Sequence, residues 1–215
     1  KEAALNYADE ISDRARLASA CNVIYLKNER LFADCTDGFG LIRDVEENLK
    51  ISLKNKKILI LGAGGAARGI IPSIIEKNPA KLKIANRTES KAFSLKADLE
   101  DKVDLKKKNL IFEAGSLLDD FLLTDSYDLV INSTSVSTQI GESIGLPKAL
   151  FSGTKLAYDL FYADEKTVFM EDALAGGAEK VSDGWGMLVE QGAESFKLWT
   201  NLIPDTSRLL EKPID

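Results

Sequence analysis

The sequence predicts an α/β protein organised around a doubly wound parallel sheet. Short apolar runs recur between residues 57 and 181, and segments with the periodicity of amphipathic helices separate most of them. The first of these runs leads directly into a glycine-rich turn. Continuous apolar runs of this length are typical of strands buried on both faces, and their alternation with helices favours a parallel sheet covered by helices on both sides.

The segment before this sheet predicts a smaller set of elements. Glu2–Ala20 has the spacing of one amphipathic helix, and Cys21–Ala33 alternates apolar and polar residues as a β-hairpin does. Thr36-Asp37-Gly38 predicts a turn ahead of a second helix over about Phe39–Lys50. One helical stretch and one hairpin are too little to bury a hydrophobic core of their own.

Six strands complete the predicted sheet. A helix over Ala66–Lys77 follows the first strand, and two amphipathic helices, Met187–Thr200 and Thr206–Glu211, follow the last. Because six strands already complete the fold, we expect these two helices to pack back on the first segment. The predicted strands are Lys57–Leu61, Lys81–Ala85, Leu110–Glu113, Leu129–Asn132, Lys155–Leu160 and one near Lys180–Val181.

The glycine-rich turn has the residue order of a dinucleotide-binding site. The strand ends at Gly62, which permits a tight turn, and Gly64 follows, where a Cβ would collide with an approaching phosphate. Ala67 is small enough for the next helix to pack closely on the strand, and the N-terminus of that helix offers unpaired N–H donors to an anion. The pattern predicts a pyrophosphate site of the Rossmann type. The alternative is a glycine turn without a ligand.

The end of the second strand favours NADP over NAD. NAD-binding sites place an Asp or Glu about 20 residues after the glycines, where it holds the ribose 2′-hydroxyl. This chain has Asn86-Arg87-Thr88 there instead. No carboxylate is present to repel a 2′-phosphate, and the guanidinium of Arg87 can bind one. The alternative is an ordinary helix N-cap at Thr88 beside a solvated arginine.

Composition excludes several other chemistries. The 215 residues include no histidine, which excludes a Ser-His-Asp catalytic triad and a zinc site with histidine ligands. No metal-ligand cluster is visible, and Cys21 and Cys35 are expected to be reduced thiols of a cytoplasmic protein. The net charge of −6 gives no reason to expect binding to nucleic acid or to an anionic membrane. No apolar run approaches the length of a membrane span.

Seven motifs, in this order and at these separations, resemble those of the shikimate dehydrogenase family along the whole chain. They are Ala20-Cys21-Asn22, Thr36-Asp37-Gly38-Phe39-Gly40, Gly62-Ala63-Gly64-Gly65-Ala66-Ala67-Arg68, Asn86-Arg87-Thr88, Asn132-Ser133-Thr134-Ser135, Tyr158-Asp159-Leu160-Phe161-Tyr162 and Asp183-Gly184-Trp185-Gly186-Met187-Leu188-Val189-Glu190-Gln191.

The resemblance implies the NADPH-dependent reduction of 3-dehydroshikimate to shikimate, a step towards aromatic amino acids. Lys1-Glu2-Ala3-Ala4 resembles the end of the motif that carries the family's catalytic lysine. The family's preceding strands, with two serines that hold the substrate carboxylate, are therefore expected to be absent here. The implied domains are the remainder of an α/β substrate domain (1–52), an NADP-binding Rossmann domain (53–186) and C-terminal helices that return to the substrate domain (187–215).

The resemblance also implies a role for individual residues. Lys1 is the implied general acid–base, and Asp37 is its carboxylate partner. The implied ligands of the substrate are Asn22, Asp37, Tyr162 and Gln191. The implied cofactor residues are Gly62, Gly64, Gly65 and Ala66 at the pyrophosphate, Asn86, Arg87 and Thr88 at the 2′-phosphate, and Thr134, Gly184 and Met187 at the nicotinamide end.

Each of the residues that would contact substrate also has a simpler interpretation. Asp37 has the spacing of a helix N-cap, and Lys1 can be a solvated terminal lysine. Asn22 can merely fix the hairpin, Tyr162 can be a core tyrosine, and Gln191 can be a solvated helix residue.

Three departures from the family pattern accompany these matches. Cys35 stands where the family usually has Asn, Ala163-Asp164 replaces a common Asn-Pro, and Trp185 replaces a usual Leu. Two alternative functions remain open: a quinate/shikimate dehydrogenase that uses NAD, against which Arg87 argues, and a non-catalytic NADP-binding module. The expected partner is a small-molecule substrate, and the chain is expected to be a monomer or a homodimer.

Overall fold

The computed structural model describes residues 2–118, 120–138 and 141–211. The described residues form two compact units. The first contains those of Lys1–Ser52, Arg68–Glu76 and Trp185–Asp215, and the second contains those of Leu53–Ala67 and Lys77–Gly184. The domain boundaries inferred from sequence, after residues 52 and 186, stay a prediction. None of the helices in these residues is long and apolar enough to cross a membrane.

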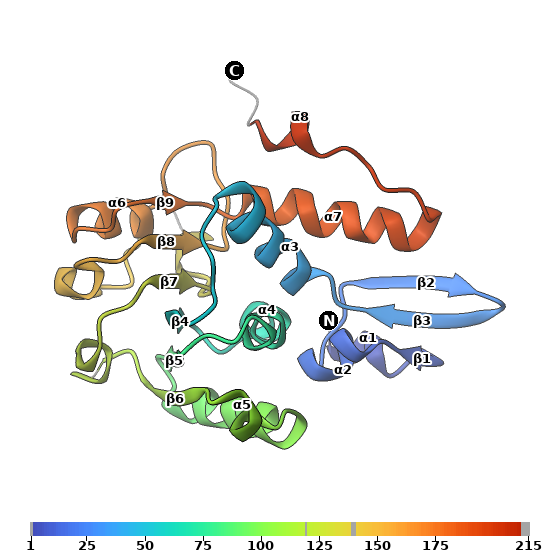
Figure 1. Cartoon of the computed structure of the whole chain (residues 1–215), viewed down its shortest axis with the longest axis horizontal. Helices are drawn as coiled ribbons and strands as arrows, with labels where there is room; N and C mark the ends of the chain where they lie inside the picture. The colour runs from blue at the N-terminus through green and yellow to red at the C-terminus, as the bar shows by residue number, and fades with distance from the viewer. Residues whose placement is uncertain (1, 119, 139–140, 212–215) are drawn as a thin grey trace. The chain divides into compact units, whose positions relative to one another are not determined.

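The second unit is built on a six-stranded sheet whose paired strands all run parallel, in the order β6-β5-β4-β7-β8-β9 (Figure 1). The chain starts in the middle of this sheet and moves outward first to one edge and then to the other, so the doubly wound α/β fold is confirmed. The strands are β4 (Lys57–Leu61), β5 (Lys81–Asn86), β6 (Ile111–Ser116), β7 (Leu129–Asn132), β8 (Leu156–Asp159) and β9 (Val181–Ser182).

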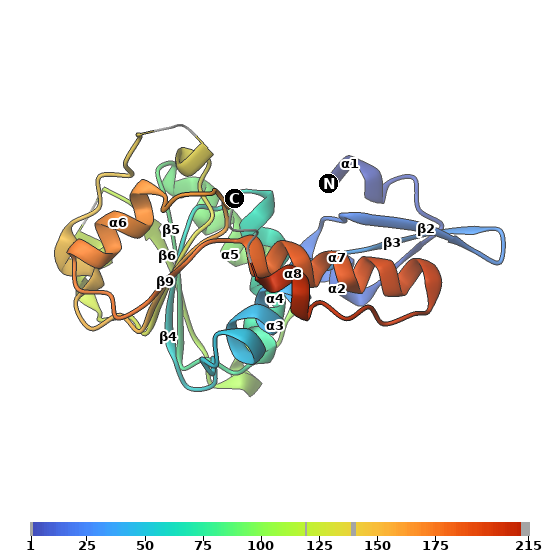
Figure 2. The ribbon, with the colours of Figure 1, turned by 90° about the horizontal axis from the view of Figure 1, so that it is seen from above.

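Burial on both faces explains why the apolar runs become strands. Four consecutive residues of β4, Ile58–Leu61, are fully buried, as central strands of a parallel sheet are. β4 and β7 have the predicted bounds, and the other four strands differ from prediction by one to three residues at their ends. Two helices cover the sheet within this unit, α5 (Glu89–Lys102) and α6 (Val168–Ala175), and Figure 2 shows them on opposite faces.

The core beneath α6 joins residues from strands, helix and loops. Leu59 and Val130 of the sheet pack with Phe169 of α6 and with Phe151, which ends a short 3₁₀ turn. The rings of Phe151 and Phe169 meet edge to face with their centroids 5.7 Å apart. This packing fixes the carboxyl ends of β7 and β8, where polar residues gather.

An ion network centred on the buried Lys83 joins strands β5 and β6 to Asp125. Lys83 is fully buried, and its Nζ lies 2.8 Å from Asp125 Oδ2 and 3.4 Å from Glu113 Oε2. Lys81 Nζ lies 2.7 Å from the same Asp125 oxygen. Burial alone would raise the pKa of Asp125, but the hydrogen bonds from Lys81 and Lys83 outweigh it and lower this pKa to about 2.

This network predicts a loss of stability in acid. A carboxyl whose pKa is lower in the folded than in the unfolded chain stabilises the fold above its unfolded pKa, near 4, and stops doing so as the pH falls through its folded pKa. We expect Asp125→Asn to have a lower urea midpoint than the wild type at pH 6. The difference should shrink below about pH 4 and vanish below about pH 2. A difference that is the same at every pH would contradict this assignment.

The first unit contains a three-stranded sheet in the order β1-β3-β2. β2 (Val23–Lys27) and β3 (Arg30–Asp34) form the predicted antiparallel hairpin, and β1 (Glu10–Ile11) pairs parallel with β3. The prediction of one helix over Glu2–Ala20 is wrong. The segment contains α1 (Glu2–Leu5), β1 and α2 (Asp13–Ala18), because backbone pairing of β1 interrupts the helical pattern and Ser12 caps α2 through its side chain.

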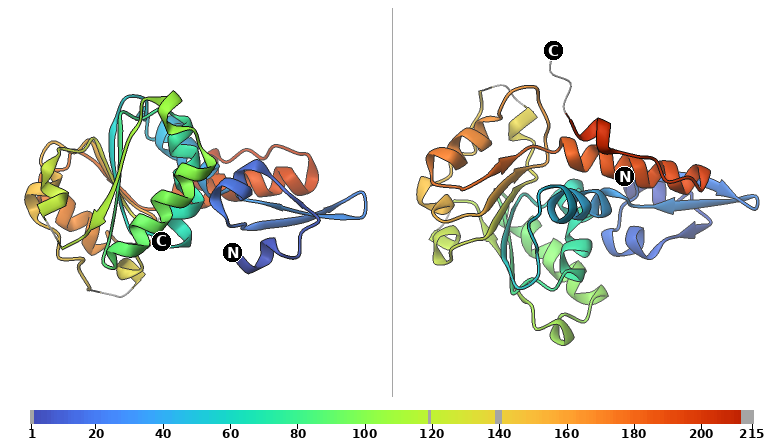
Figure 3. Two further views of the ribbon diagram at one scale, coloured as in Figure 1. Left: turned by 90° about the horizontal axis from the view of Figure 1, so that it is seen from below. Right: turned by 45° about the horizontal axis from the view of Figure 1, so that its top comes forward.

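Helices complete the first unit. α3 (Asp37–Arg43) continues into a π-helical turn, Asp44–Asn48, so the predicted helix over Phe39–Lys50 begins and ends about two residues early. α7 (Trp185–Thr200) packs against α3, as Figure 3 shows, and α8 (Ser207–Leu210) follows it. The helices α3 and α7 touch closely: a Cβ on Gly40 would lie 2.6 Å from the carbonyl oxygen of Met187.

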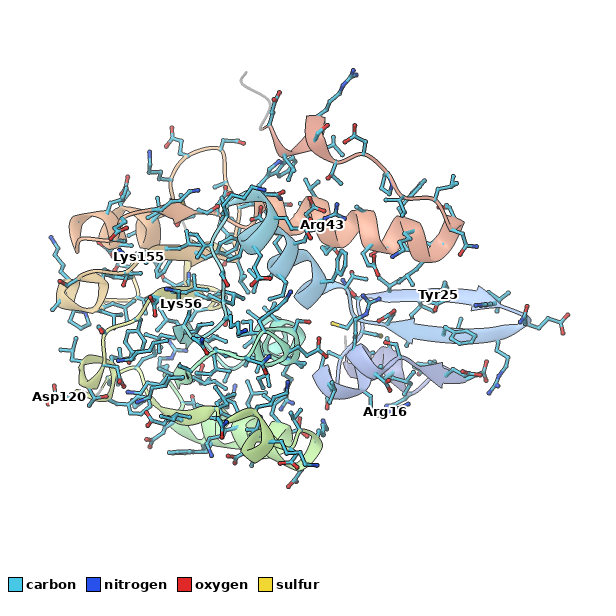
Figure 4. All side chains as sticks on the ribbon, in the orientation of Figure 1. Arg16, Tyr25, Arg43, Lys56, Asp120 and Lys155 are labelled. Atoms are coloured by element: carbon cyan, nitrogen blue, oxygen red, sulfur yellow. The ribbon has the colours of Figure 1, made fainter. Side chains whose placement is uncertain are left out.

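Polar contacts hold the same helices together. Arg43 Nε, labelled in Figure 4, lies 3.1 Å from the buried carboxylate of Glu190 in α7. The indole of Trp199 donates to the carbonyl of Ile24 in β2 at 3.3 Å. α7 therefore packs on the first segment, as expected from the completed sheet, whereas α8 contacts α7. Residues 68–76 of α4 (Gly65–Glu76) also belong to this unit.

Candidate functional site

The glycine loop between β4 and α4 has the geometry that a pyrophosphate requires. Gly62 has a φ of +106°, and a Cβ there would lie 2.6 Å from Ser133 Oγ, so both backbone conformation and packing require glycine. At Gly64 and Gly65 the opposite holds: no described atom of the chain lies within 4 Å of where a Cβ would be. The fold itself thus leaves room beside the helix N-terminus, which suits the close approach of an anion.

Asn86, at the end of β5, links this loop to the next turn. Its Oδ1 accepts from the backbone N–H of Ala63 at 3.2 Å, and its Nδ2 donates to the carbonyl of Thr88 at 2.8 Å. The amide thereby fixes the position of Arg87 relative to the glycine loop. Arg87 is exposed, and among the described residues it makes no ion pair.

Thr88 occupies the N-cap position of α5, but its side chain makes no capping hydrogen bond. Thr88 at the N-cap and an exposed Arg87 fit the alternative of an ordinary N-cap beside a solvated arginine as well as a 2′-phosphate site, so the role of these residues stays a prediction. The exposed Arg87 and Thr88 side chains follow the carboxyl end of β5, next to the strand that leads into the glycine loop. This is the edge at which doubly wound sheets bind ligands.

Thr134 follows β7 at the same edge. Its backbone N–H and its hydroxyl both donate to Asn132 Oδ1, at 3.0 and 2.7 Å. Gly184 lies against the turn after β8, where a Cβ would collide with the carbonyl oxygen of Leu160. Both residues therefore have fixed positions beyond the carboxyl ends of the strands.

Tyr162 also follows β8 and is 46% exposed, which rules out the alternative of a core tyrosine. Its ring stacks on that of Phe161 with the centroids 6.1 Å apart. An aromatic side chain held in this way can offer its hydroxyl to a ligand at little further cost in side-chain entropy.

In the first unit, Asn22 gathers Asp37 and Gln191 around its side chain. Asn22 Nδ2 lies 2.8 Å from Asp37 Oδ1 and 3.0 Å from Gln191 Oε1. Asn22 Oδ1 accepts from the backbone N–H of Thr36 at 2.8 Å. Three residues that the family resemblance assigned to the substrate, from segments up to 169 positions apart, are thus brought into one hydrogen-bonded cluster.

The contacts in this cluster test the simpler interpretations of Asp37, Gln191 and Asn22. Thr36, not Asp37, is the N-cap of α3, and Asp37 is the first helical residue. Gln191 is half-buried and bonded, so it is not a solvated helix residue. Asn22 does fix the hairpin, since its backbone N–H donates to the carbonyl of Asp34 at the end of β3, but its side chain also bonds to Thr36 and Asp37.

Asp37 is buried to 6% exposure, and one of its flanks is closed by α4. A Cβ on Gly69 would lie 2.7 Å from Asp37 Oδ2. Cys35, two residues before Asp37, is also buried and lies in a small cluster with Ala15, Ala33 and Cys21. Its Sγ lies 3.9 Å from the carbonyl oxygen of Gly69.

Lys1 and Met187 are the remaining predicted site residues. Lys1 lies outside the described residues. Met187 lies in α7, one turn before Gln191, and both side chains are half-buried. Within the described part of the chain, no group of three or more histidine, cysteine or acidic residues is arranged to hold a metal ion.

The fold and the loop define a class of protein: a Rossmann-type dinucleotide-binding protein with a separate cluster of polar side chains in its first unit. The model of the family "Shikimate / quinate 5-dehydrogenase" matches residues 44–156, and that of the "Shikimate 5'-dehydrogenase C-terminal domain" matches residues 184–211. A shikimate dehydrogenase (NADP(+)) of Dechloromonas aromatica is 42% identical over 98% of this chain and 73% of its own length.

Solved structures agree with this match. An Ael1 enzyme from Pseudomonas putida superposes with a TM-score of 0.86 at 38% identity, over 99% of this chain and 74% of its own. The shikimate 5-dehydrogenase of Thermus thermophilus, solved in complex with NADP(H) and shikimate, gives a TM-score of 0.80 at 32% identity, over 98% and 74%. This chain belongs to the shikimate dehydrogenase family.

The residues predicted for the site did not include two polar residues at the carboxyl ends of β7 and β8, although both lie within quoted motifs. Asn132 and Asp159 are fully buried, face each other across β7 and β8, and bond to the loops that contain Thr134 and Tyr162. A polar residue that ends an otherwise apolar strand was the available signal, because such a residue must find a partner when buried.

Proposed function

We propose that this chain catalyses the NADPH-dependent reduction of 3-dehydroshikimate to shikimate. It is an oxidoreductase of the shikimate dehydrogenase family, and its cofactor is NADP. The single observation that carries the proposal is the cluster in which Asn22 holds Asp37 and Gln191 together, since these are the residues that the family resemblance assigns to the substrate. The reaction belongs to the synthesis of aromatic amino acids, and we place it in the cytoplasm.

The residues around the sheet edge fit the cofactor. Gly62, Gly64, Gly65 and Ala66 would hold its pyrophosphate through backbone N–H groups at the start of α4. The guanidinium of Arg87 would bind the 2′-phosphate through charge-assisted hydrogen bonds, with Asn86 fixing the turn. Thr134, Gly184 and Met187 would lie at its nicotinamide end.

When bound, NADPH supplies a hydride to the carbonyl carbon of the substrate. The oxygen of that carbonyl then requires a proton, and Lys1 is the donor that we propose. Asp37 would hold the ammonium of Lys1 in place, because a buried carboxylate attracts a cation and orients its N–H groups. Asn22, Tyr162 and Gln191 would orient the substrate through its hydroxyls.

The test is shikimate-dependent reduction of NADP by this polypeptide, followed by the absorbance of NADPH. Quinate in place of shikimate and NAD in place of NADP serve as parallel arms. Turnover with shikimate and NADP well above the other combinations supports the proposal. Turnover that favours NAD and quinate would assign the alternative dehydrogenase, and tight binding of NADP without any turnover would assign the non-catalytic module.

The same assay tests the acid–base residue. Lys1→Ala is expected to lower kcat by about 100-fold or more, because the proton donor is lost, while the Kd of NADP stays close to that of the wild type. An unchanged kcat would remove Lys1 from the mechanism.

A further inference from the structure

Asp159, at the carboxyl end of β8, is a buried carboxylate to which the proposed function gives no role. Its exposure is 0%, and no lysine or arginine among the described residues forms an ion pair with it. Its two oxygens instead accept four hydrogen bonds. The donors are Asn132 Nδ2 at 3.0 Å, Ser137 Oγ at 2.6 Å, Thr167 Oγ1 at 2.7 Å and the backbone N–H of Phe161 at 3.2 Å.

Burying a carboxylate without a cationic partner costs free energy unless hydrogen bonds satisfy both of its oxygens. Burial raises the pKa of Asp159, and the hydrogen bonds from Ser137 and Thr167 only partly offset this effect. An apolar residue at the end of β8 would avoid the desolvation cost altogether. The presence of a carboxylate here is therefore best explained by its effect on its four donors, which it holds in fixed positions.

The first element that Asp159 fixes is the loop after β7. Because the carboxylate accepts from Asn132 Nδ2, the amide of Asn132 must turn its Oδ1 away, and this Oδ1 accepts both the N–H and the hydroxyl of Thr134. Asn132 Nδ2 and Asp159 Oδ2 also both bond to Ser137 Oγ. The loop from Thr134 to Ser137 is thus held at both of its ends.

The second element is the turn after β8. The bond from Phe161 N–H to Asp159 Oδ1 closes this turn, and Leu160 N–H donates to the carbonyl of Asn132 at 2.9 Å. The turn leads directly into Tyr162. Gly184 packs on the same turn, and its N–H donates to the carbonyl of Phe161 at 3.0 Å.

We propose that Asp159 is a positioning residue, which holds Thr134, Tyr162 and Gly184 where hydride transfer requires them. The inference rests on the proposed function, which assigns these three residues to the nicotinamide and the substrate. Asp159 itself is fully buried and acts only through the loops that it bonds.

Two substitutions distinguish the effect of the hydrogen bonds of Asp159 from the effect of its negative charge. Asp159→Leu removes all four acceptor contacts. Asp159→Asn can keep them, since its Oδ1 still accepts from Asn132 and Phe161, and the hydroxyls of Ser137 and Thr167 can rotate to accept from its Nδ2. Tyr127→Phe is the matched control, because it deletes one buried hydrogen bond in the same unit, from Tyr127 to the carbonyl of Leu122.

The experiment compares turnover with the binding of two probes. NADP has both ends of the cofactor, whereas adenosine 2′,5′-bisphosphate has the 2′-phosphate end and lacks the nicotinamide. We expect Asp159→Leu to lower kcat by about 100-fold and to raise the Kd of NADP by about fivefold, with the Kd of adenosine 2′,5′-bisphosphate within about twofold of the wild type. Asp159→Asn should keep kcat within about fivefold of the wild type, and Tyr127→Phe should match the wild type in all three quantities.

The outcomes are distinct. Equal weakening of both probes in Asp159→Leu, or an unchanged kcat, would overturn the positioning role, and so would a loss of kcat in Asp159→Asn as large as that in Asp159→Leu. If the wild type itself does not oxidise shikimate, the proposed function fails. The ratio of the two Kd values still decides the role of Asp159, because a selective loss for NADP supports it and no selective loss overturns it.

Discussion

Asp37→Asn is expected to lower kcat for shikimate oxidation by about 100-fold or more, while the Kd of NADP stays within about threefold of the wild type. The substitution keeps the size of the side chain and one oxygen that can accept from Asn22, so the cluster with Gln191 is retained. It removes the negative charge that we propose to hold the catalytic lysine. Steady-state kinetics and equilibrium titration with NADP measure the two quantities.

Asp44→Asn is the control for this experiment. Asp44 is also a buried carboxylate of the first unit and follows directly on α3, seven residues after Asp37. We expect this variant to keep kcat within about threefold of the wild type, because no role in catalysis is assigned to it. Equal losses in both variants would indicate a general effect of charge removal, and a fully active Asp37→Asn would remove Asp37 from the mechanism. Thermal unfolding of each variant verifies that it is folded.

Arg87→Ala is expected to weaken NADP by about 10- to 100-fold and to change the Kd of NAD by less than about threefold. Hydrogen bonds between charged groups contribute about 1.5–3 kcal/mol, and each 1.4 kcal/mol corresponds to about a factor of ten. NAD lacks the 2′-phosphate, so it loses none of this interaction. Because Arg87 is exposed and among the described residues makes no ion pair, its removal should not disturb the fold.

Lys107→Ala provides the matched control, since it removes one positive charge from an exposed side chain of the same unit. Its effect on NADP should stay within about twofold and should disappear at high salt, where long-range attraction is screened. Equal weakening of NADP and NAD in Arg87→Ala would exclude Arg87 from a 2′-phosphate site.

The sheet could be predicted from sequence because each strand carries its own signal. Ile58–Leu61 and Leu129–Ile131 are apolar runs that must be buried on both faces, and a run of that kind has few other interpretations. Glu10–Ile11 could not be predicted in the same way. A strand of two residues has no periodicity, and it exists here only because it pairs with Phe32–Ala33, which is 22 residues further along the chain.

The polar residues of the site also divide into those that a local sequence pattern could predict and those that it could not. Glycine and arginine in the loops after β4 and β5 could be interpreted locally, since their spacing alone indicates a phosphate site. The contact of Asn22 with Gln191 joins residues 169 positions apart, and no local pattern contains it. Only the family resemblance brought these two residues together. Asp159 was quoted within a motif, but its four donors come from β7, from the 3₁₀ turn after β7 and from both ends of the connection between β8 and α6, so its importance is visible only in three dimensions.

The positions of the two tryptophans, Trp185 and Trp199, give the first unit an optical signal of its own. Both lie in α7, and each indole N–H donates to a backbone carbonyl of that same unit, Leu209 or Ile24. Intrinsic emission excited at the indole band therefore reports melting of the first unit, whereas far-ultraviolet circular dichroism follows both units. Transitions that coincide in the two signals would mean that the protein melts in one step, and an earlier change in emission would mean that the unit with the Asp37 cluster opens first.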